Sequence, residues 1–331
     1  LMPDIKFIAP ENILKNSYTN DINPEIYRNK FRIQLPQAFF WEQTDLLEYL
    51  KNHNNPLLVN LTNTAPAFYQ NQIVTIHDVM FLKNPKWYSK KHYYFYKNLF
   101  YQIAHNSKKV VTVSNFSKKE LIKYFNLQPD KIEVVHNAVS QDFVKLIDEN
   151  FINNYGKYIL AVSSLDPRKN FAGLIQAFNM LKLKDVKLVI VGDKGVIQSQ
   201  KQLKVLTKDN SNIIFTGHIS DRELANLYKN AELFIFPSFY EGFGIPPLEA
   251  MACGCPTVVS GAASIPEICA DASYYIEPND INNIAKGIKD VLNSETLKSG
   301  LREKGLIRAR AFNWRDSAEK YVDIMGVLTN D

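Results

Sequence analysis

The feature that most constrains the fold of this chain is an alternation of short apolar runs with helical stretches, which occurs twice along the sequence. The runs are brief and rich in branched residues, as expected for strands buried on both faces of a sheet. In the first half they are Ile5–Ile8, Leu57–Asn60, Ile73–Ile76, Val110–Val113 and Ile132–Val135. In the second half they are Ile159–Val162, Leu188–Val191, Ile213–Phe215, Leu233–Phe236 and Thr257–Val259. Strand–helix–strand order at this spacing predicts parallel sheets with right-handed crossovers.

Helical patterns separate these strands and divide the chain into two domains. The expected helices are Glu42–Lys51, Ser89–Ala104, Ser117–Phe125, Phe171–Leu183, Gln198–Lys208, Asp221–Asn230, Pro247–Ala252, Ile281–Leu292 and Ser294–Phe312. Ser117 and Ser220 open capping-box patterns, and Asn170 is a predicted N-cap. We expect one Rossmann-like domain over 1–145, a second over 146–312, and a final helix, Trp314–Ile324 within 313–331, that returns to the first domain. Two such sheets in tandem predict a cleft at the carboxyl ends of their strands.

The bulk composition is that of an ordinary globular protein long enough for two domains. Of the 331 residues, 46% are hydrophobic and 22% are charged, and the formal net charge of +5 argues only weakly for an anionic partner. Three cysteines without metal-ligand spacing are interpreted as reduced thiols: Cys253, Cys255 and Cys269. No apolar run is long enough to span a membrane, and no signal-peptide pattern is visible, so we expect a cytoplasmic protein.

The strongest chemical signal lies between Phe236 and Gly254. A strand ends at Phe236, a loop with two glycines follows, and a helix begins near Pro247, as prolines prefer. Glycines let backbone N–H groups approach a ligand closely, and a helix N-terminus attracts anionic groups. Glu241 precedes the helix and Glu249 lies within it, and a carboxylate can accept hydrogen bonds from vicinal hydroxyls of a sugar or ribose. The alternative is a strand–turn–helix with two solvent-facing glutamates, which the sequence after Gly244 makes the less favoured interpretation.

This segment resembles the E-x7-E signature of the family-4 retaining glycosyltransferases, which have the GT-B fold. Five ordered segments elsewhere resemble the strand ends of the donor and acceptor domains of that family: Ile76–Asp78, Val113–Lys118, Ile159–Asn170, Val189–Gly192 and Phe215–His218. The resemblance covers nearly the whole chain. It implies an α/β protein with two Rossmann-like domains whose parallel sheets face a central cleft, and it does not indicate the sugar.

Lys169 follows a strand and precedes a helix capped by Asn170, which suits a diphosphate because an ammonium and a helix N-terminus meet at one point. In the family, the matching lysine stabilises the nucleotide-diphosphate leaving group. Many members also carry a Gly-Arg pair where this chain has Ser163 and Ser164. The phosphate charge would then be neutralised by Lys169 together with Arg168. Without the other motifs, a solvated turn is the less favoured alternative for Arg168 and Lys169.

The resemblance implies a donor site in the second domain. Glu249 would hold the ribose hydroxyls, Glu241 the sugar hydroxyls, and Lys169 with the Gly242–Gly244 loop the diphosphate, while main chain near Gly217 flanks the base. The donor-binding residues implied are Ser164, Arg168, Lys169, Gly217, His218, Glu241, Gly242, Phe243, Gly244 and Glu249.

His77 ends an expected strand, where a lone histidine is more often structural than catalytic. The resemblance implies instead that it contacts the transferred sugar and supports the developing positive charge through its backbone carbonyl. The catalytic residues implied are His77, Lys169 and Glu241, and the residues assigned to the acceptor side are Asn63, Thr64 and Ser114.

The segment from Val79 to Lys119 contains nine lysines and no acidic residue, with aromatic residues interleaved. Basic and aromatic residues together can bind nucleic acid or a membrane surface. A helix with an aromatic core face and a lysine-rich outer face explains most of them. Peripheral contact with the inner face of the membrane remains open, because related enzymes often use this region near anionic lipids, and nucleic acid is not expected.

No metal-ligand spacing is visible among the six histidines, and no Asp-x-Asp motif is present, so we expect no metal and no cofactor besides the nucleotide-sugar substrate. The implied activity is retaining transfer of a hexose, with GDP-mannose as the first guess for the donor, to a glycan or lipid-linked acceptor in polysaccharide or lipopolysaccharide synthesis. Front-face displacement is the expected route, so the carboxylate-spacing rules of glycosidases do not apply.

Two alternatives to this enzyme remain open from the sequence. One is a sugar-nucleotide epimerase with the same fold, and the other is a protein that binds sugar nucleotides without turnover. The family begins with a strand, a glycine-containing loop and a helix before the strand that Ile5–Ile8 matches, whereas only Leu1–Asp4 precede Ile5 here. From this we expect a first domain of reduced stability and poor transfer by the chain as given.

Overall fold

The computed structural model describes residues 5–10, 25–27, 37–192, 203–208 and 210–329. The chain divides into two compact units. Unit 1 comprises residues 1–113, 117–135 and 318–331, and unit 2 comprises residues 114–116 and 136–317. Part of the expected helix Gln198–Lys208 lies outside the described residues.

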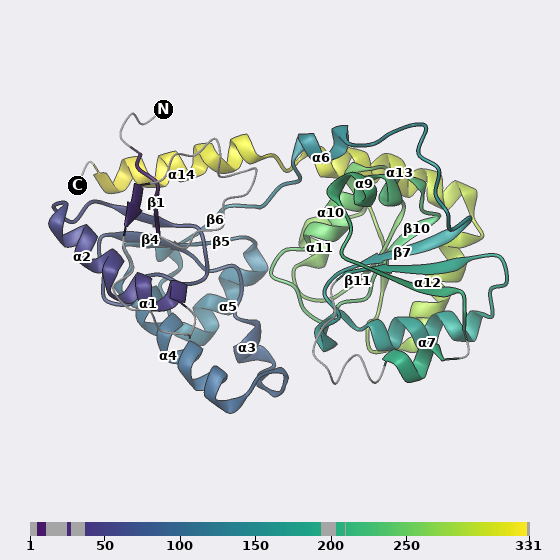
Figure 1. Cartoon of the computed structure of the whole chain (residues 1–331), viewed down its shortest axis with the longest axis horizontal. Helices are drawn as coiled ribbons and strands as arrows, with labels where there is room; N and C mark the ends of the chain where they lie inside the picture. Colours follow the sequence, from purple (N-terminus) through teal and green to yellow (C-terminus); the bar gives the residue numbers. More distant parts are fainter. Residues whose placement is uncertain (1–4, 11–24, 28–36, 193–202, 209, 330–331) are drawn as a thin grey trace. The chain divides into compact units, whose positions relative to one another are not determined.

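Unit 1 is built on a four-stranded parallel sheet in the order β3-β4-β5-β6 (Figure 1). Its strands are β3 (Leu58–Asn60), β4 (Gln72–Thr75), β5 (Lys109–Thr112) and β6 (Ile132–Val134). Each lies within one residue of its predicted bounds, because the buried β-branched runs are short and clearly separated. The helices that accompany them include α3 (Met80–Lys83), α4 (Lys90–Asn106) and α5 (Asn115–Phe125).

The two faces of this sheet bury different partners. Val74 and Val110 pack in one cluster with Ile103 of α4. Ile73 and Val111 face the other way, where side chains of α14 (Trp314–Thr329) pack on them. Figure 1 shows α14, in yellow, along unit 1. The last helix of the chain therefore completes the core of the unit that contains the first residues.

The prediction of a buried strand at Ile5–Ile8 is wrong. The strand is β1 (Ile8–Pro10), which pairs in parallel with β2 (Glu25–Tyr27) in a two-stranded sheet separate from β3–β6. Ile5 is 54% exposed and Phe7 is 53% exposed. Apolar composition alone does not bury a run whose hydrogen-bonding neighbour is a single short strand.

Two helix predictions in unit 1 also need correction. The single helix expected over Glu42–Lys51 is two helices, α1 (Gln37–Gln43) and α2 (Asp45–Asn52), because Thr44 leaves the helical backbone region with φ −127° and ψ −74°. The N-cap expected at Ser117 is wrong as well.

Helix α5 starts at Asn115, and Ser117 is buried inside it. The N–H groups of Asn115 and Phe116 donate to the carboxylate of Glu267. A carboxylate distant in the sequence thus accepts hydrogen bonds from N–H groups at the start of the helix, a role that a local N-cap side chain would otherwise fill.

Unit 2 contains a six-stranded parallel sheet in the order β12-β11-β10-β7-β8-β9. Its strands are β7 (Tyr158–Val162), β8 (Lys187–Val191), β9 (Ile213–Gly217), β10 (Leu233–Phe236), β11 (Thr257–Ser260) and β12 (Tyr274–Ile276). The first five were predicted from the sequence. The sixth, β12, was not predicted.

Helices cover both faces of this sheet (Figure 1). Helices α7 and α12 pack together on one side, and α9, α10 and α13 are neighbours on the other. The helices of unit 2 include α6 (Gln141–Lys145), α7 (Phe171–Leu181), α9 (Asp221–Asn230), α10 (Ile245–Ala252), α11 (Ile265–Cys269), α12 (Ile281–Leu292) and α13 (Glu295–Arg310). Two predicted caps are confirmed. Asn170 accepts a hydrogen bond from the N–H of Gly173, and Ser220 accepts one from the N–H of Glu223.

Within the described ranges, none of the helices combines the length and the apolar character needed to cross a membrane.

Gly192 directly follows β8 at the edge of the sheet where the predicted donor residues lie. Its φ is +148°, and a Cβ built there would lie 1.8 Å from the carbonyl oxygen of Ser163. The neighbouring atom is backbone, so it cannot turn aside as a side chain could. Only glycine allows β7 and β8 to end this close together.

We therefore expect Gly192→Ala to destabilise the protein by about 3 kcal/mol or more, since the backbone must shift or remain strained. Gly300→Ala is the control, because a Cβ at Gly300, inside α13, meets nothing within 4 Å. It should stabilise by about 0.5–1 kcal/mol through helix propensity. Urea denaturation followed by circular dichroism measures both, and a wild-type midpoint for Gly192→Ala would contradict the steric argument.

Candidate active site

The polar cluster of unit 2 forms where two neighbouring strands end. Strand β7 leads into the short 3₁₀ helix η3 (Pro167–Lys169), and β10 leads into the loop before α10. Because β7 and β10 pair in parallel, their carboxyl ends meet at one edge of the sheet. Residues about 70 positions apart in the sequence are thereby brought into contact, as in the pair Lys169–Glu241 with its separation of 72.

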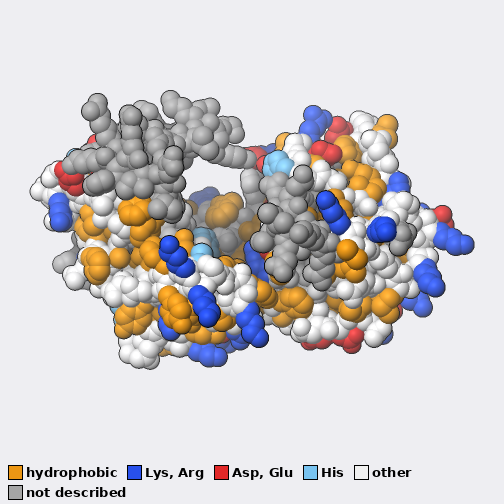
Figure 2. All heavy atoms as spheres, turned by 60° about the horizontal axis from the view of Figure 1, so that its bottom comes forward, with side chains coloured by type: hydrophobic (Ala, Val, Ile, Leu, Met, Phe, Trp, Pro, Cys, Tyr) orange, Lys and Arg blue, Asp and Glu red, His pale blue; other side chains and the backbone are white. Residues whose placement is uncertain are grey.

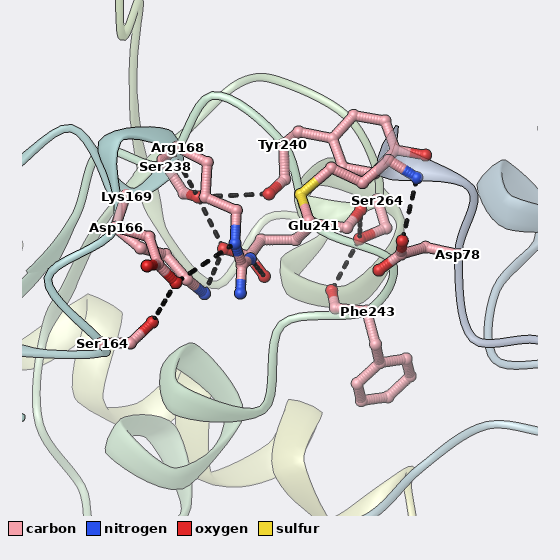
Figure 3. Close-up of polar contacts among 11 residues, drawn as sticks. Asp78, Ser164, Asp166, Arg168, Lys169, Ser238, Tyr240, Glu241, Phe243 and Ser264 are labelled. Atoms are coloured by element: carbon pink, nitrogen blue, oxygen red, sulfur yellow. Dashed lines mark hydrogen bonds and ion pairs between the residues drawn. The ribbon is translucent and has the colours of Figure 1, made fainter. Parts of the chain in front are cut away.

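Glu241 lies at the centre of this cluster (Figure 3). Its Oε1 accepts hydrogen bonds from Lys169 Nζ at 2.6 Å and from Ser238 Oγ at 2.5 Å. Its Oε2 accepts from Arg168 Nη1 at 3.3 Å. Glu241 is 8% exposed and Lys169 is 7% exposed. Two cations and one hydroxyl therefore hold a single buried carboxylate in one orientation.

The ammonium of Lys169 is held in a poorly solvated place. Burial lowers its pKa from the ordinary value, and the neighbouring Glu241 carboxylate opposes that shift. The ring of Phe236 lies 5.1 Å from Nζ and adds a cation–π contact. A positive charge with so little water around it attracts an anion more strongly than an exposed lysine does. The group is thus suited to bind a phosphate.

Hydrogen bonds to main-chain carbonyls hold the loop around Glu241. Ser264 Oγ lies 2.9 Å from the carbonyl oxygen of Glu241 and 2.7 Å from that of Phe243. Ser114, which belongs to unit 2, donates to the carbonyl of Gly242 at 2.6 Å. Gly244 has φ +117°, and a Cβ there would approach Ile265 Cδ1 to 2.7 Å. The loop is fixed before α10 begins at Ile245.

Asp166 and the hydroxyl of Ser164 lie at the same edge of the sheet. Ser164 Oγ donates to Asp166 Oδ2 at 2.7 Å, and Arg168 Nε lies 3.9 Å from the same oxygen. Arg168 therefore sits between the carboxylates of Asp166 and Glu241. Its guanidinium is restrained from two sides, and 23% of its side chain stays exposed.

Glu249 forms a separate small site on α10. Its Oε2 accepts a hydrogen bond from the hydroxyl of Tyr228 at 3.0 Å. Burial raises the pKa of Glu249 above its ordinary value, and the bond from Tyr228 opposes that shift. Among the described residues, no hydrogen bond or ion pair joins Glu249 to Glu241. The two glutamates of the motif are thus held by different partners.

The sequence of the chain matches two family models. The family described as "Glycosyl transferases group 1" matches residues 142–308, and "Glycosyltransferase Family 4" matches residues 11–143. The first match covers half of the chain and includes every residue of the Glu241 cluster except Ser114. The chain is a member of the group 1 glycosyltransferases.

Similar proteins agree with this assignment. The "O-antigen chain mannosyltransferase B" of Escherichia coli is 29% identical over 309 residues, which are 90% of this chain and 79% of the relative. Among solved structures, sucrose-phosphate synthase from Thermosynechococcus elongatus has a TM-score of 0.75 at 19% identity, over 98% of this chain and 88% of that one. Anabaena Alr3699/HepE in complex with UDP-glucose has a TM-score of 0.73 at 18% identity, over 94% and 88%. These structures show that the enzyme has the GT-B fold.

The other predicted donor residues of the glycosyltransferase lie at the end of β9. Gly217 has φ +73°, and its carbonyl accepts a hydrogen bond from the N–H of Gly192 at 3.1 Å. His218 follows it and is exposed. Within the described ranges, no hydrogen bond or ion pair joins either residue to Glu249 or Lys169. Their assignment to the nucleobase stays a prediction.

The predicted acceptor residues of unit 1 lie in the loop after β3 and at the end of β4. The N–H of His77 donates to Asn63 Oδ1 at 2.8 Å, and the ring Nε2 lies 3.2 Å from the carbonyl of Leu61. Thr64 Oγ1 donates to Glu42 Oε1 at 3.2 Å. His77 and Asn63, predicted separately, are thus in contact, and their role toward an acceptor stays a prediction.

Sequence reasoning missed four residues that hold the site together. Ser238 and Asp166 lie inside the segments that carried the resemblance, so their hydroxyl and carboxylate could have been singled out there. Tyr228 and Ser264 lie outside those segments, and nothing in the local sequence marks them. Glu42 was also missed. It supports the loop of unit 1, and burial raises its pKa.

Helix α4 and the segment before it present both expected faces. Leu99, Phe100 and Ile103 are buried in the core of unit 1. Exposed lysines and aromatic residues share the outer surface: Lys83, Lys86, Lys90, Lys91, Tyr94, Phe95, Lys97 and Tyr101. Figure 2 shows lysine or arginine side chains beside hydrophobic ones at the lower left of its view. The helix therefore has one buried face, and its exposed surface carries both lysines and aromatic rings.

Proposed function

We propose that this glycosyltransferase moves a hexose, with retention, from a nucleotide-diphospho-sugar to a glycan or lipid-linked acceptor in cell-surface polysaccharide or lipopolysaccharide synthesis. The observation that carries the proposal is the buried cluster of Lys169, Arg168 and Glu241 at the carboxyl edge of the six-stranded sheet. It combines cations for a diphosphate with a carboxylate for hydroxyls, and a nucleotide sugar needs both.

The names of similar proteins support the choice of substrates. The relative from Escherichia coli is named for O-antigen chains and mannose, and the Anabaena structure was solved with UDP-glucose. A GDP-mannose-like donor is the first candidate for this chain. A thermal-shift panel of nucleotide sugars identifies the donor that the later experiments use.

Each member of the donor site has a distinct proposed task. Lys169 and Arg168 hold the diphosphate, and the Gly242–Gly244 loop lies beside it. Glu241 accepts hydrogen bonds from sugar hydroxyls, and Glu249 accepts them from the ribose. In the structure Lys169 already pairs with Glu241. Once a donor is bound, the ammonium group of Lys169 would contact both the Glu241 carboxylate and the phosphate oxygens.

The proposed reaction is a front-face displacement at the anomeric carbon. The bond from that carbon to the phosphate oxygen breaks as the bond to the acceptor oxygen forms, and a leaving phosphate oxygen accepts the acceptor's proton. The sugar passes through an oxocarbenium-like state, which the backbone carbonyl of His77 would stabilise. Charge develops mainly on the leaving diphosphate, so preorganised cations beside it lower the barrier.

Lys169→Ala should reduce turnover about 10²- to 10³-fold, because a preorganised charge beside the leaving group is lost. Donor affinity should fall as well. Initial rates of nucleoside diphosphate release with the donor from the panel measure both. Lys184→Ala removes an exposed lysine of the same unit and should have no effect. Lys169→Ala within threefold of wild type, in a folded protein, would refute the assignment.

Glu249→Gln and Glu241→Gln should affect different parts of the donor. Glu249→Gln should weaken binding of both the nucleotide sugar and the free nucleoside diphosphate, since a charged acceptor for the ribose hydroxyls is lost. Glu241→Gln should weaken binding of the nucleotide sugar far more than binding of the free diphosphate, because a charged acceptor for the sugar hydroxyls is lost. Calorimetry with both ligands tests the division, and the reverse pattern would overturn it.

Transfer should persist in excess EDTA, because Lys169 and Arg168 supply the positive charge that a metal ion supplies in other transferases. Initial rates before and after chelation measure this. A complete loss of activity that Mg²⁺ or Mn²⁺ restores would show that the diphosphate is held through a metal ion.

We also propose that the outer surface of α4 and the segment before it contact anionic lipids. Lysines among exposed aromatic rings match a negatively charged interface, where rings insert and ammonium groups stay at the headgroups. Each lysine near such a surface contributes about 1 kcal/mol.

Binding to phosphatidylglycerol vesicles in a sedimentation assay should exceed binding to phosphatidylcholine vesicles. Lys90→Glu with Lys97→Glu should reduce it by about 10-fold or more. The matched pair Lys184→Glu with Lys204→Glu, two exposed lysines of unit 2, should not. Equal losses in the two pairs would mean that overall charge, rather than this surface, attracts the lipid.

A further inference from the structure

We infer that Tyr228 is a positioning residue for nucleotide recognition, which orients the Glu249 carboxylate toward the ribose hydroxyls. The inference rests on the proposed role of Glu249. It adds a residue that lies outside all the sequence motifs, on α9, and that does not itself touch the ligand.

The geometry of Tyr228 is that of a rigid support. Its side chain is fully buried, and its ring makes edge-on contacts with Phe234 at 5.4 Å and Phe143 at 6.3 Å. The hydroxyl reaches Glu249 Oε2 at 3.0 Å. A ring fixed on two sides offers one donor direction, so it holds the carboxylate in one rotamer.

The two carboxylate oxygens of Glu249 are therefore different. Oε2 is engaged by Tyr228, whereas Oε1 has no hydrogen-bond partner among the described residues. Glu249 is half-buried. A ribose offers two adjacent hydroxyls, and a carboxylate with one oxygen held and the other open presents acceptors to both along a fixed direction.

The same contact affects the charge on Glu249. Burial and the charge of Asp221 raise its pKa, and the Tyr228 hydrogen bond lowers it. Cys253, at the end of the same helix, is a buried thiol whose pKa is raised to about 12, so it stays neutral. Lys229 on α9 lowers that pKa. The charge of Arg302 on α13 lowers the pKa of Cys255.

The sign of the pH dependence follows from these contributions. Ionised Glu249 accepts hydrogen bonds from ribose better than its protonated form, so affinity should fall as the pH falls through the pKa of Glu249. Without the Tyr228 hydroxyl that pKa should rise, and the acid limb of binding should move to higher pH. Without the charge of Asp221 it should move to lower pH.

The test uses Tyr228→Phe, which keeps the ring and removes the hydroxyl. Tyr158→Phe is the matched control, because Tyr158 is equally buried in unit 2 and its hydroxyl donates at 2.7 Å to the carbonyl of Leu227. Calorimetry with GDP and UDP over pH 5–8 gives the affinity of each variant. Tyr228→Phe should weaken binding about 10-fold at pH 7, as expected for a lost hydrogen bond to a charged group, and shift the acid limb upward. Tyr158→Phe should change neither.

Further variants separate positioning from a structural role. In a Glu249→Gln background, Tyr228→Phe should have little further effect, because the two residues act as one unit. Asp221→Asn should shift the acid limb downward.

Three results would overturn the inference. One is unchanged binding in Tyr228→Phe while Glu249→Gln binds weakly, which leaves the proposed function intact. Another is a Tyr228→Phe protein that does not fold, which would assign the hydroxyl to stability. The last is a wild-type protein that binds neither nucleotide at any pH, which would also refute the proposed function.

Discussion

The site depends on the parallel pairing of β7 with β10 in the middle of the six-stranded sheet. This pairing places the turn that carries Lys169 beside the loop that carries Glu241. The buried ion pair between them would be costly without its additional partners, because both charges lose water. Ser238 and Arg168 provide those partners, so the carboxylate is satisfied by three donors before any ligand arrives.

The same pair explains how an enzyme can keep cations preorganised without a ligand. Burial favours the uncharged form of a lysine, and it lowers the pKa of Lys169. The Glu241 carboxylate opposes that shift in pKa and so favours the charged form of Lys169, whose Nζ lies beside the aromatic ring of Phe236. In the proposed reaction a donor diphosphate would meet a cation already in place, and the reorganisation at the moment of reaction would be small.

The two glutamates of the motif differ because their surroundings differ. Glu241 lies among cations, whereas Glu249 lies against a phenol, and within the described part of the chain no cation contacts it. A single signature in the sequence therefore contains two chemically distinct acceptors. The different partners of the two carboxylates are consistent with the separate sugar and ribose roles proposed for Glu241 and Glu249.

The sequence by itself determined the two alternating α/β patterns, the strand ends at which Lys169 and Glu241 lie, and the local caps Asn170 and Ser220. These features depend on residues close together in the chain, so periodicity and cap chemistry predict them. Only the tertiary structure decided which distant groups meet. The start of α5 depends on Glu267, the orientation of Glu249 on Tyr228, and the position of Ile8 on a separate strand pair, because each is set by a partner that local sequence does not specify.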